Sequence, residues 1–106
     1  MKYTTPEINT RFDLLYKYER RCVIYFLQEV GHADLTDIVY VLTKQDPISN
    51  DPDRIEISLR HTHLPKLAST GVLEFDSRSD TVQYSGDELI ENVLDITPDT
   101  HVPVNV

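Results

Sequence analysis

The sequence predicts an α+β domain that is mainly α-helical and carries a β-hairpin towards its C-terminal end. Its 106 residues are enough for one domain and too few for two. Apolar residues recur at helical spacing up to residue 71, and two short β-prone runs follow. Apolar residues make up 40% of the chain, enough to bury a core. We expect a single domain over residues 1–96, with its core at about 11–84, and an extended tail over 97–106.

The first helix is predicted from about Pro6 to Leu15. Thr5, Pro6 and Glu7 form its start, because a hydroxyl can cap free N–H groups and proline fits the first helical position. An acidic residue there also lies at the positive end of the helix dipole. The apolar residues on one side of this helix are Ile8, Phe12 and Leu15.

A second helix is predicted from about Tyr18 to Val30, where Gly31 ends the apolar periodicity. The pattern leaves open whether residues 16–18 break the two helices or join them. For the next, short helix, Asp34 is a candidate cap with Asp37 three positions on, as in a capping box. Its expected buried stripe is Leu35, Ile38, Val39 and Leu42.

A longer helix is predicted to start at Asp51 and Pro52, to reach Ser69 or Thr70, and to end at Gly71. Pro65 lies inside it. Because proline cannot donate a hydrogen bond to the carbonyl of His61, we expect a bend near residues 61–64.

Two short β-prone runs, Val72–Phe75 and Thr81–Tyr84, predict a hairpin with a polar tip over residues 76–80. Gly86 and Asp87 open a last helix. Its apolar face is formed by Leu89, Ile90, Val93 and Leu94.

Three helices followed by a hairpin are the order of a winged helix-turn-helix, with flanking N- and C-terminal helices. The third of these helices is here the longer one that starts at Asp51 and Pro52. In that fold the third helix enters the major groove of DNA and the hairpin, or wing, lies along the backbone.

Two segments carry a more specific resemblance. Residues 63–75 resemble the end of the recognition helix and the first wing strand of ArsR-like winged helices, with the pattern H-L-x-x-L and, a few residues later, a glycine and two apolar residues. Glu19-Arg20-Arg21, Thr62 to Leu67 and Gly71 to Asp76 resemble a haloarchaeal family of small winged-helix proteins more closely. The resemblance covers about Arg11 to Tyr84, and it implies a DNA-binding transcriptional regulator.

Candidate DNA contacts are the side chains of the third helix that can donate hydrogen bonds to phosphates or to guanine, together with a cation at the wing tip. They are Arg54, Ser58, Arg60, His61, Thr62, His63, Lys66 and Arg78. The alternative for each is a solvated helix face. Arg78 is flanked by Asp76 and Asp80, which could pair with it or repel DNA. Residues 54–78 sum to +1, whereas residues 1–53 and 79–106 sum to −3 and −6.

The overall charge of −8 argues against indiscriminate coating of nucleic acid, which depends on neutralisation by Lys and Arg. Of 18 acidic residues 11 are Asp, and Lys occurs only four times. This mixture is typical of salt-loving archaea, although an ordinary acidic protein fits nearly as well. In a salty cytoplasm, direct base contacts and dimer avidity would have to contribute more than phosphate contacts.

A homodimer is expected through the N-terminal helix and the face formed by Leu89, Ile90, Val93 and Leu94, unless that face covers the domain's own core. No metal, cofactor or enzymatic activity is expected. His61 and His63 point in different directions on a helix, and Cys22 has no second cysteine. The apolar runs are too short to span a membrane, so we expect a cytoplasmic protein.

Two functions are compatible with these patterns. The first is a sequence-specific regulator bound to double-stranded DNA, of cellular, viral or plasmid origin. The second is a winged-helix module that binds a protein partner and does not meet DNA.

Overall fold

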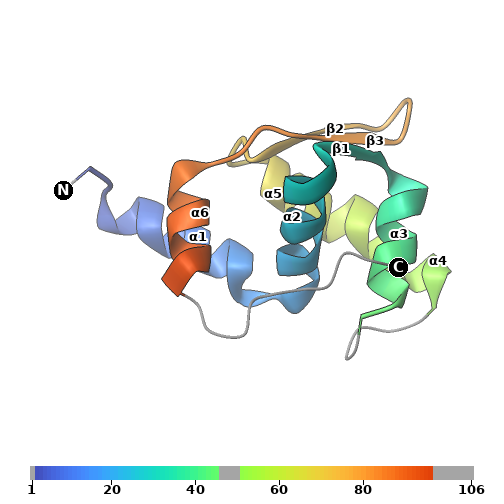
Figure 1. Ribbon diagram of the computed structural model, residues 1–106, viewed down its shortest axis with the longest axis horizontal. Coiled ribbons are helices and arrows are strands. Elements are labelled where there is room, and N and C mark those ends of the chain that lie inside the picture. Colours follow the sequence, from blue (N-terminus) through green and yellow to red (C-terminus); the bar gives the residue numbers. More distant parts are fainter. Residues whose placement is uncertain (1, 46–50, 97–106) are drawn as a thin grey trace.

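The computed structural model describes residues 2–45 and 51–96, and the structural statements below concern these two segments. It is a mainly helical α+β domain with one small antiparallel sheet (Figure 1). The predicted tail at 97–106 lies outside the described residues. The helices within the described segments are all too short or too polar to cross a lipid bilayer.

Helix α1 (Thr5–Tyr16) begins one residue earlier than predicted. Its cap is Thr4, whose hydroxyl accepts from the N–H of Glu7 while the Glu7 carboxylate reaches back to Thr4, a complete capping box. Lys17 is extended, with φ −83° and ψ 130°, so α1 ends there and α2 (Tyr18–Val30) starts afresh. Gly31, with φ 82°, donates to the Leu27 carbonyl at 2.8 Å and ends α2 as predicted.

Helix α3 (Leu35–Thr43) starts at Asp34, but not through the predicted capping box. The Asp34 side chain makes no capping hydrogen bond. The free N–H of Leu35 instead donates to the backbone carbonyl of Asp80 at 2.7 Å, so the hairpin turn caps this helix. The predicted stripe of Leu35, Ile38, Val39 and Leu42 is buried.

The predicted long helix consists of three parts, α4 (Pro52–Ser58), the π-helical turn η1 (Leu59–His63) and α5 (Leu64–Ala68). Asp51 caps α4 through its carboxylate, as predicted. In η1 the N–H of Leu64 donates to the carbonyl of Leu59, five residues back. The irregularity falls where the missing donor of Pro65 predicts one, and it takes the form of a wider turn.

The sheet has the strand order β1-β3-β2, with β1 at His32–Asp34, β2 at Leu73–Asp76 and β3 at Thr81–Tyr84. Strands β2 and β3 form the predicted hairpin, in which Glu74 pairs with Gln83. Strand β1 was not predicted; it pairs antiparallel with β3, opposite Val82 at Ala33. In Figure 1 the sheet lies along one edge of the molecule, and the β2–β3 turn projects beyond α3.

Helix α6 (Glu88–Ile96) lies beside α1 at the end of the molecule opposite α3 (Figure 1). Its apolar face is covered by the chain itself, since Leu89, Ile90, Val93 and Leu94 are 7%, 0%, 3% and 6% exposed. The prediction that these four residues form a dimer interface is therefore wrong. On α1, Leu14 is buried in the core and Phe12, which was placed on the inner side, is 46% exposed.

A partly buried ion pair joins α6 to α1. Arg11 Nη2 lies 3.0 Å from Asp87 Oδ2, and Asp87 Oδ1 also accepts from the N–H of Ile90 at 2.8 Å, which caps α6. Burial alone raises the pKa of Asp87, but the hydrogen bonds from Arg11 and Ile90 outweigh it and the pKa lies below its usual value. Asp87 therefore stabilises the fold in its charged form.

We predict that Asp87→Asn lowers the free energy of unfolding by about 1 kcal/mol at neutral pH, because asparagine keeps the cap and loses the ion pair. Since the folded pKa is depressed, this stability is present above about pH 4 and is lost as the pH falls through the folded pKa. The difference between variant and wild type should therefore shrink towards zero near pH 2 in urea titrations. Asp95→Asn, an exposed change on α6, is the control; a difference that stays constant with pH would contradict the assignment.

Candidate nucleic-acid interface

The predicted DNA contacts do not all lie on the surface. Arg54, His61, Thr62, Lys66 and Arg78 are exposed, and Ser58 and Arg60 are half-buried. His63 is 5% exposed and lies inside the molecule. Its burial removes it from any surface that a duplex could touch, which corrects the prediction for that residue.

Arg60 is held by carboxylates on both sides. Its Nη1 and Nη2 donate to the two Asp80 oxygens at 2.8 and 2.7 Å, and its Nε donates to Glu56 at 3.2 Å. The hydrogen bonds that Arg60 donates to Asp80 and Glu56 raise the pKa of Arg60, and the contact with Arg60 lowers the pKa of Asp80. Asp80 thus pairs with Arg60 of the helix and not with Arg78, the partner that the sequence analysis considered.

Asp80 connects three elements at one point. It is the one non-glycine residue of the described chain with positive φ, at 56°, a conformation that Asp tolerates better than most residues. Its carboxylate holds Arg60 of η1 while its backbone carbonyl caps α3 at Leu35. The hairpin turn is therefore fixed against the middle of the helix formed by α4, η1 and α5.

Lys66, a second cation of this helix, is paired as well. Lys66 Nζ lies 3.0 Å from Asp13 Oδ2 of α1, and both side chains are largely exposed. The positive sum over residues 54–78 leaves out Asp13 and Asp80, the two carboxylates that the fold brings to these cations. The surface is consequently less positive than the local sequence indicated.

Arg78 lies in the turn between β2 and β3, exposed to solvent. Its backbone N–H donates to Asp76 Oδ1 at 2.9 Å, which fixes the turn and leaves the guanidinium outside that contact. Exposed donors on the helix, His61 and Thr62, and a cation on the turn thus flank the Arg60–Asp80 contact.

Arg20 is a buried arginine at the start of α2, 4% exposed. It donates to the backbone carbonyls of Leu14 and Asp13, the latter at 3.0 Å, and its Nη1 lies 3.3 Å from His63 Nδ1. Burial lowers the pKa of this guanidinium, with partial compensation from Asp13 and Glu19, and it stays protonated because its intrinsic pKa is so high. Its neighbour Arg21 donates to the carbonyls of Leu15 and Tyr16.

Together Arg20 and Arg21 satisfy the last carbonyls of α1, which the break at Lys17 leaves without helical donors. The Glu19-Arg20-Arg21 motif is in this respect a helix C-cap supplied by the next helix. Arg20 also fixes the tautomer of His63: a guanidinium only donates, so Nδ1 accepts and the proton lies on Nε2. Burial lowers the pKa of His63, against the opposing effect of Glu19, and keeps the ring neutral.

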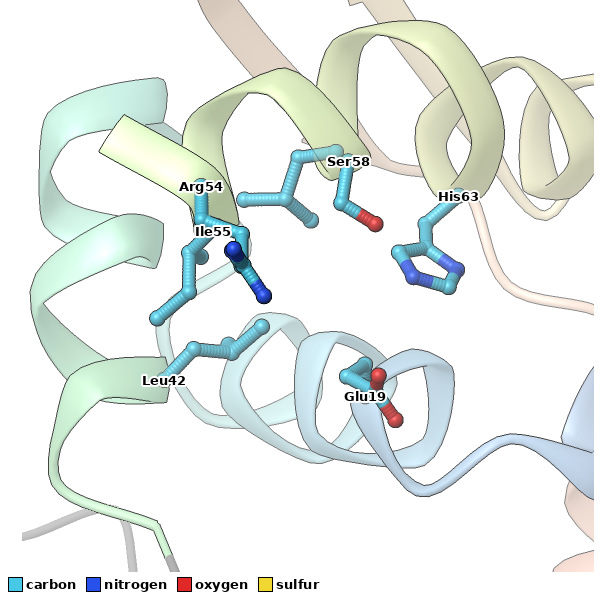
Figure 2. A pocket seen from close by; sticks show the side chains of 7 residues that line it. Glu19, Leu42, Arg54, Ile55, Ser58 and His63 are labelled. Carbon is cyan, nitrogen blue, oxygen red and sulfur yellow. The ribbon is translucent and has the colours of Figure 1, made fainter. Parts of the chain in front are cut away.

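A cavity of about 140 Å³ lies between the start of α2, the end of α3 and α4–η1. Its polar lining is Glu19, Arg54, Ser58 and His63, over the apolar side chains of Leu42, Ile55 and Leu59. Figure 2 shows the polar ends directed into the same space. Three predicted DNA contacts, Arg54, Ser58 and His63, therefore share a hollow with Glu19, a residue that the sequence analysis did not assign to a site. No sequence signal joins Glu19 to residues some forty positions away.

In the described part of the chain no group of three or more His, Cys, Asp or Glu residues is arranged to hold a metal ion. Cys22 is fully buried, and burial raises its pKa to about 12, so the sulfur is a thiol at neutral pH.

Residues 12–83 match the family described as "Domain of unknown function (DUF7344)". The match spans more than half of the chain, and the protein belongs to this family. The matched span runs from α1 to β3 and leaves out α6. Comparison with curated proteins and with solved structures finds no match.

We predict that Arg20→Met destabilises the protein by about 3 kcal/mol, because two buried carbonyls and His63 Nδ1 lose their donor. Arg20→Lys should recover only part of this, since one ammonium cannot reach three acceptors that lie around a planar guanidinium. Urea unfolding followed by circular dichroism measures both. A Met variant as stable as the wild type would show that the buried charge contributes nothing net.

Proposed function

We propose that this protein is a DNA-binding transcriptional regulator of the winged helix-turn-helix type. In this proposal the helix formed by α4, η1 and α5 enters the major groove, and the β2–β3 turn lies on the neighbouring backbone. The observation that carries the proposal is the contact between Arg60 and Asp80 at 2.7 Å, which sets the hairpin turn beside the middle of this helix.

The exposed residues around that contact support the proposal. His61 and Thr62 are exposed on the helix, and Arg78 is exposed on the turn. An imidazole and a hydroxyl can donate to or accept from base edges, and an arginine at the turn suits a phosphate or the minor groove. A groove-binding helix and a backbone-binding turn need this relative position.

The ion pairs of Arg60 and Lys66 would compete with phosphate binding. A phosphate would have to displace Asp80 or Glu56 from Arg60, and Asp13 from Lys66. We therefore propose that base contacts from neutral donors carry more of the affinity than phosphate neutralisation. This fits the haloarchaeal setting proposed from the composition, where molar salt weakens phosphate contacts most.

The proposed dimer needs another surface, since α6 packs against its own chain. Phe12 and Tyr16, four residues apart on α1, are 46% and 75% exposed. We place the expected homodimer contact there, on the N-terminal helix.

One observation favours the second candidate, a protein-binding module. Ile57 is 60% exposed on α4, three residues before Arg60, which is already paired with Glu56 and Asp80. An apolar residue at that position suits a protein surface better than phosphate.

A selection from genomic DNA fragments in about molar KCl separates the two candidates, and we predict that it enriches a reproducible motif. Replacing both His61 and Thr62 by alanine should reduce affinity for that motif by about 1–3 kcal/mol per lost base contact. The control is Asn92→Ala, an exposed change on α6. Failure to enrich any motif, with the folded protein confirmed by circular dichroism, would exclude the regulator.

We further predict that Asp80→Asn strengthens DNA binding. Asparagine tolerates the same positive φ, and Arg60, left with Glu56 as its one carboxylate partner in the described chain, becomes more available to a phosphate. An exposed ion pair contributes up to about 1 kcal/mol, so the affinity should rise by up to about fivefold. The dependence of log K on log salt should steepen by about one unit.

Asp76→Asn is the matched control for this experiment. It removes the same charge from the same turn, and Asp76 makes no contact with Arg60 among the described residues. A salt dependence that changes equally in the two variants would contradict a specific release of Arg60.

A further inference from the structure

We infer that the cavity between α2, α3 and α4–η1 binds a small zwitterion, an amino acid with a short apolar side chain. The inference goes beyond DNA binding, because the site is a hollow between helices, lined by buried and half-buried side chains and by the exposed Arg54. Its polar groups are Glu19 on α2, Arg54 and Ser58 on α4, and His63 at the end of η1.

Two side chains of opposite charge line the cavity. Glu19 and Arg54 both line it, and neither forms an ion pair within residues 2–45 and 51–96. The other arginines of the helices are all engaged by carboxylates or carbonyls; they are Arg11, Arg20, Arg21 and Arg60. A ligand with an ammonium and a carboxylate would satisfy Glu19 and Arg54 at once.

His63 adds a directed donor. Its Nδ1 is occupied by Arg20 at 3.3 Å, which leaves the proton on Nε2, and the contact with Arg20 is the one hydrogen bond of this ring in the described chain. The ring is 5% exposed and lines the cavity. The same ring ends the π-helical turn, a local irregularity that occurs frequently at functional sites.

Size and lining narrow the ligand class. The volume of about 140 Å³ is well below the roughly 300–1,000 Å³ of pockets for drug-sized ligands. Leu42, Ile55 and Leu59 form the apolar part of the lining and suit one or a few methyl groups. A purely anionic ligand would meet the Glu19 carboxylate, and a purely cationic one would meet Arg54. A short-chain amino acid avoids both repulsions.

An occupied site would link α2 to the helix proposed to enter DNA, through Glu19 on one side and Arg54 and Ser58 on the other. Only this coupling rests on the proposed function. The binding itself is measured without DNA, so its failure leaves the DNA-binding proposal unaffected.

The test is a titration of the full chain with L-alanine, followed by the imidazole resonances of His63 in NMR spectra. We expect a saturable shift and a several-fold difference in affinity between L- and D-alanine, because a built site is chiral and a general solute effect is not. Acetate and methylammonium, each carrying half of the charge pattern, should bind at least about tenfold more weakly, since a charged hydrogen bond is worth about 1.5–3 kcal/mol.

Glu19→Gln and Arg54→Gln should each weaken L-alanine binding by about tenfold or more, and Arg78→Gln, outside the cavity, should not. Arg54 is exposed and Glu19 half-buried, so the fold should tolerate both changes, as circular dichroism can verify. The proposal is overturned by the absence of a saturable shift with glycine, L-alanine, L-serine and L-valine. Equal shifts with both alanine enantiomers, or full binding by acetate alone, overturn it as well.

The coupling has its own measurement. If the proposed regulator binds its selected motif, saturating L-alanine should change its Kd in the wild type and not in Glu19→Gln. An unchanged Kd with L-alanine bound would refute the coupling and leave the site in place.

Discussion

The structure depends on the buried guanidinium of Arg20. It lies where α1 ends, where α2 begins and where η1 meets α5, and its donors reach the carbonyls of Asp13 and Leu14 and the ring of His63. A buried charge is tolerated only when its donors are satisfied, so these three acceptors have to stay in place together. The relative positions of the first two helices and the proposed DNA-binding helix follow from that requirement.

Asp80 has the corresponding role between the hairpin turn and the middle of the same helix. Its carboxylate holds Arg60, its carbonyl caps α3, and its positive φ forms the hairpin turn. The hairpin is thereby fixed to both helices of the proposed helix-turn-helix. The same contact occupies the guanidinium of Arg60, a cation of the proposed interface. The ion pair that positions the hairpin turn therefore also limits phosphate binding. In the proposed complex, base contacts would therefore discriminate between sequences more than charge.

Most elements could be predicted because their signals are local. The glycine at position 31, the cap at Asp51 and the two β-prone runs each depend on a few neighbouring residues, whereas the pattern left open whether residues 16–18 break the helix. Strand β1 was not predicted because a segment of three residues is too short to show an alternation of apolar and polar side chains. Its formation depends on pairing with β3. The predicted capping box at Asp34 was wrong for a related reason. The N–H of Leu35 donates to the carbonyl of Asp80 in the distant hairpin turn, whereas the local pattern predicted a side-chain cap.

The sequence by itself determined the class of fold, the position of the π-helical irregularity near Pro65 and the candidate donors of the third helix. Only the tertiary structure decided which of these donors face outward. It turned His63 towards Arg20, gathered Arg54 and Ser58 around a cavity with Glu19, paired Arg60 with Asp80 and covered the α6 stripe with α1. The helical periodicity of a sequence predicts which residues share a face. Burial and ion pairing depend on the segment that packs against that face, and this segment is often many residues away in the sequence.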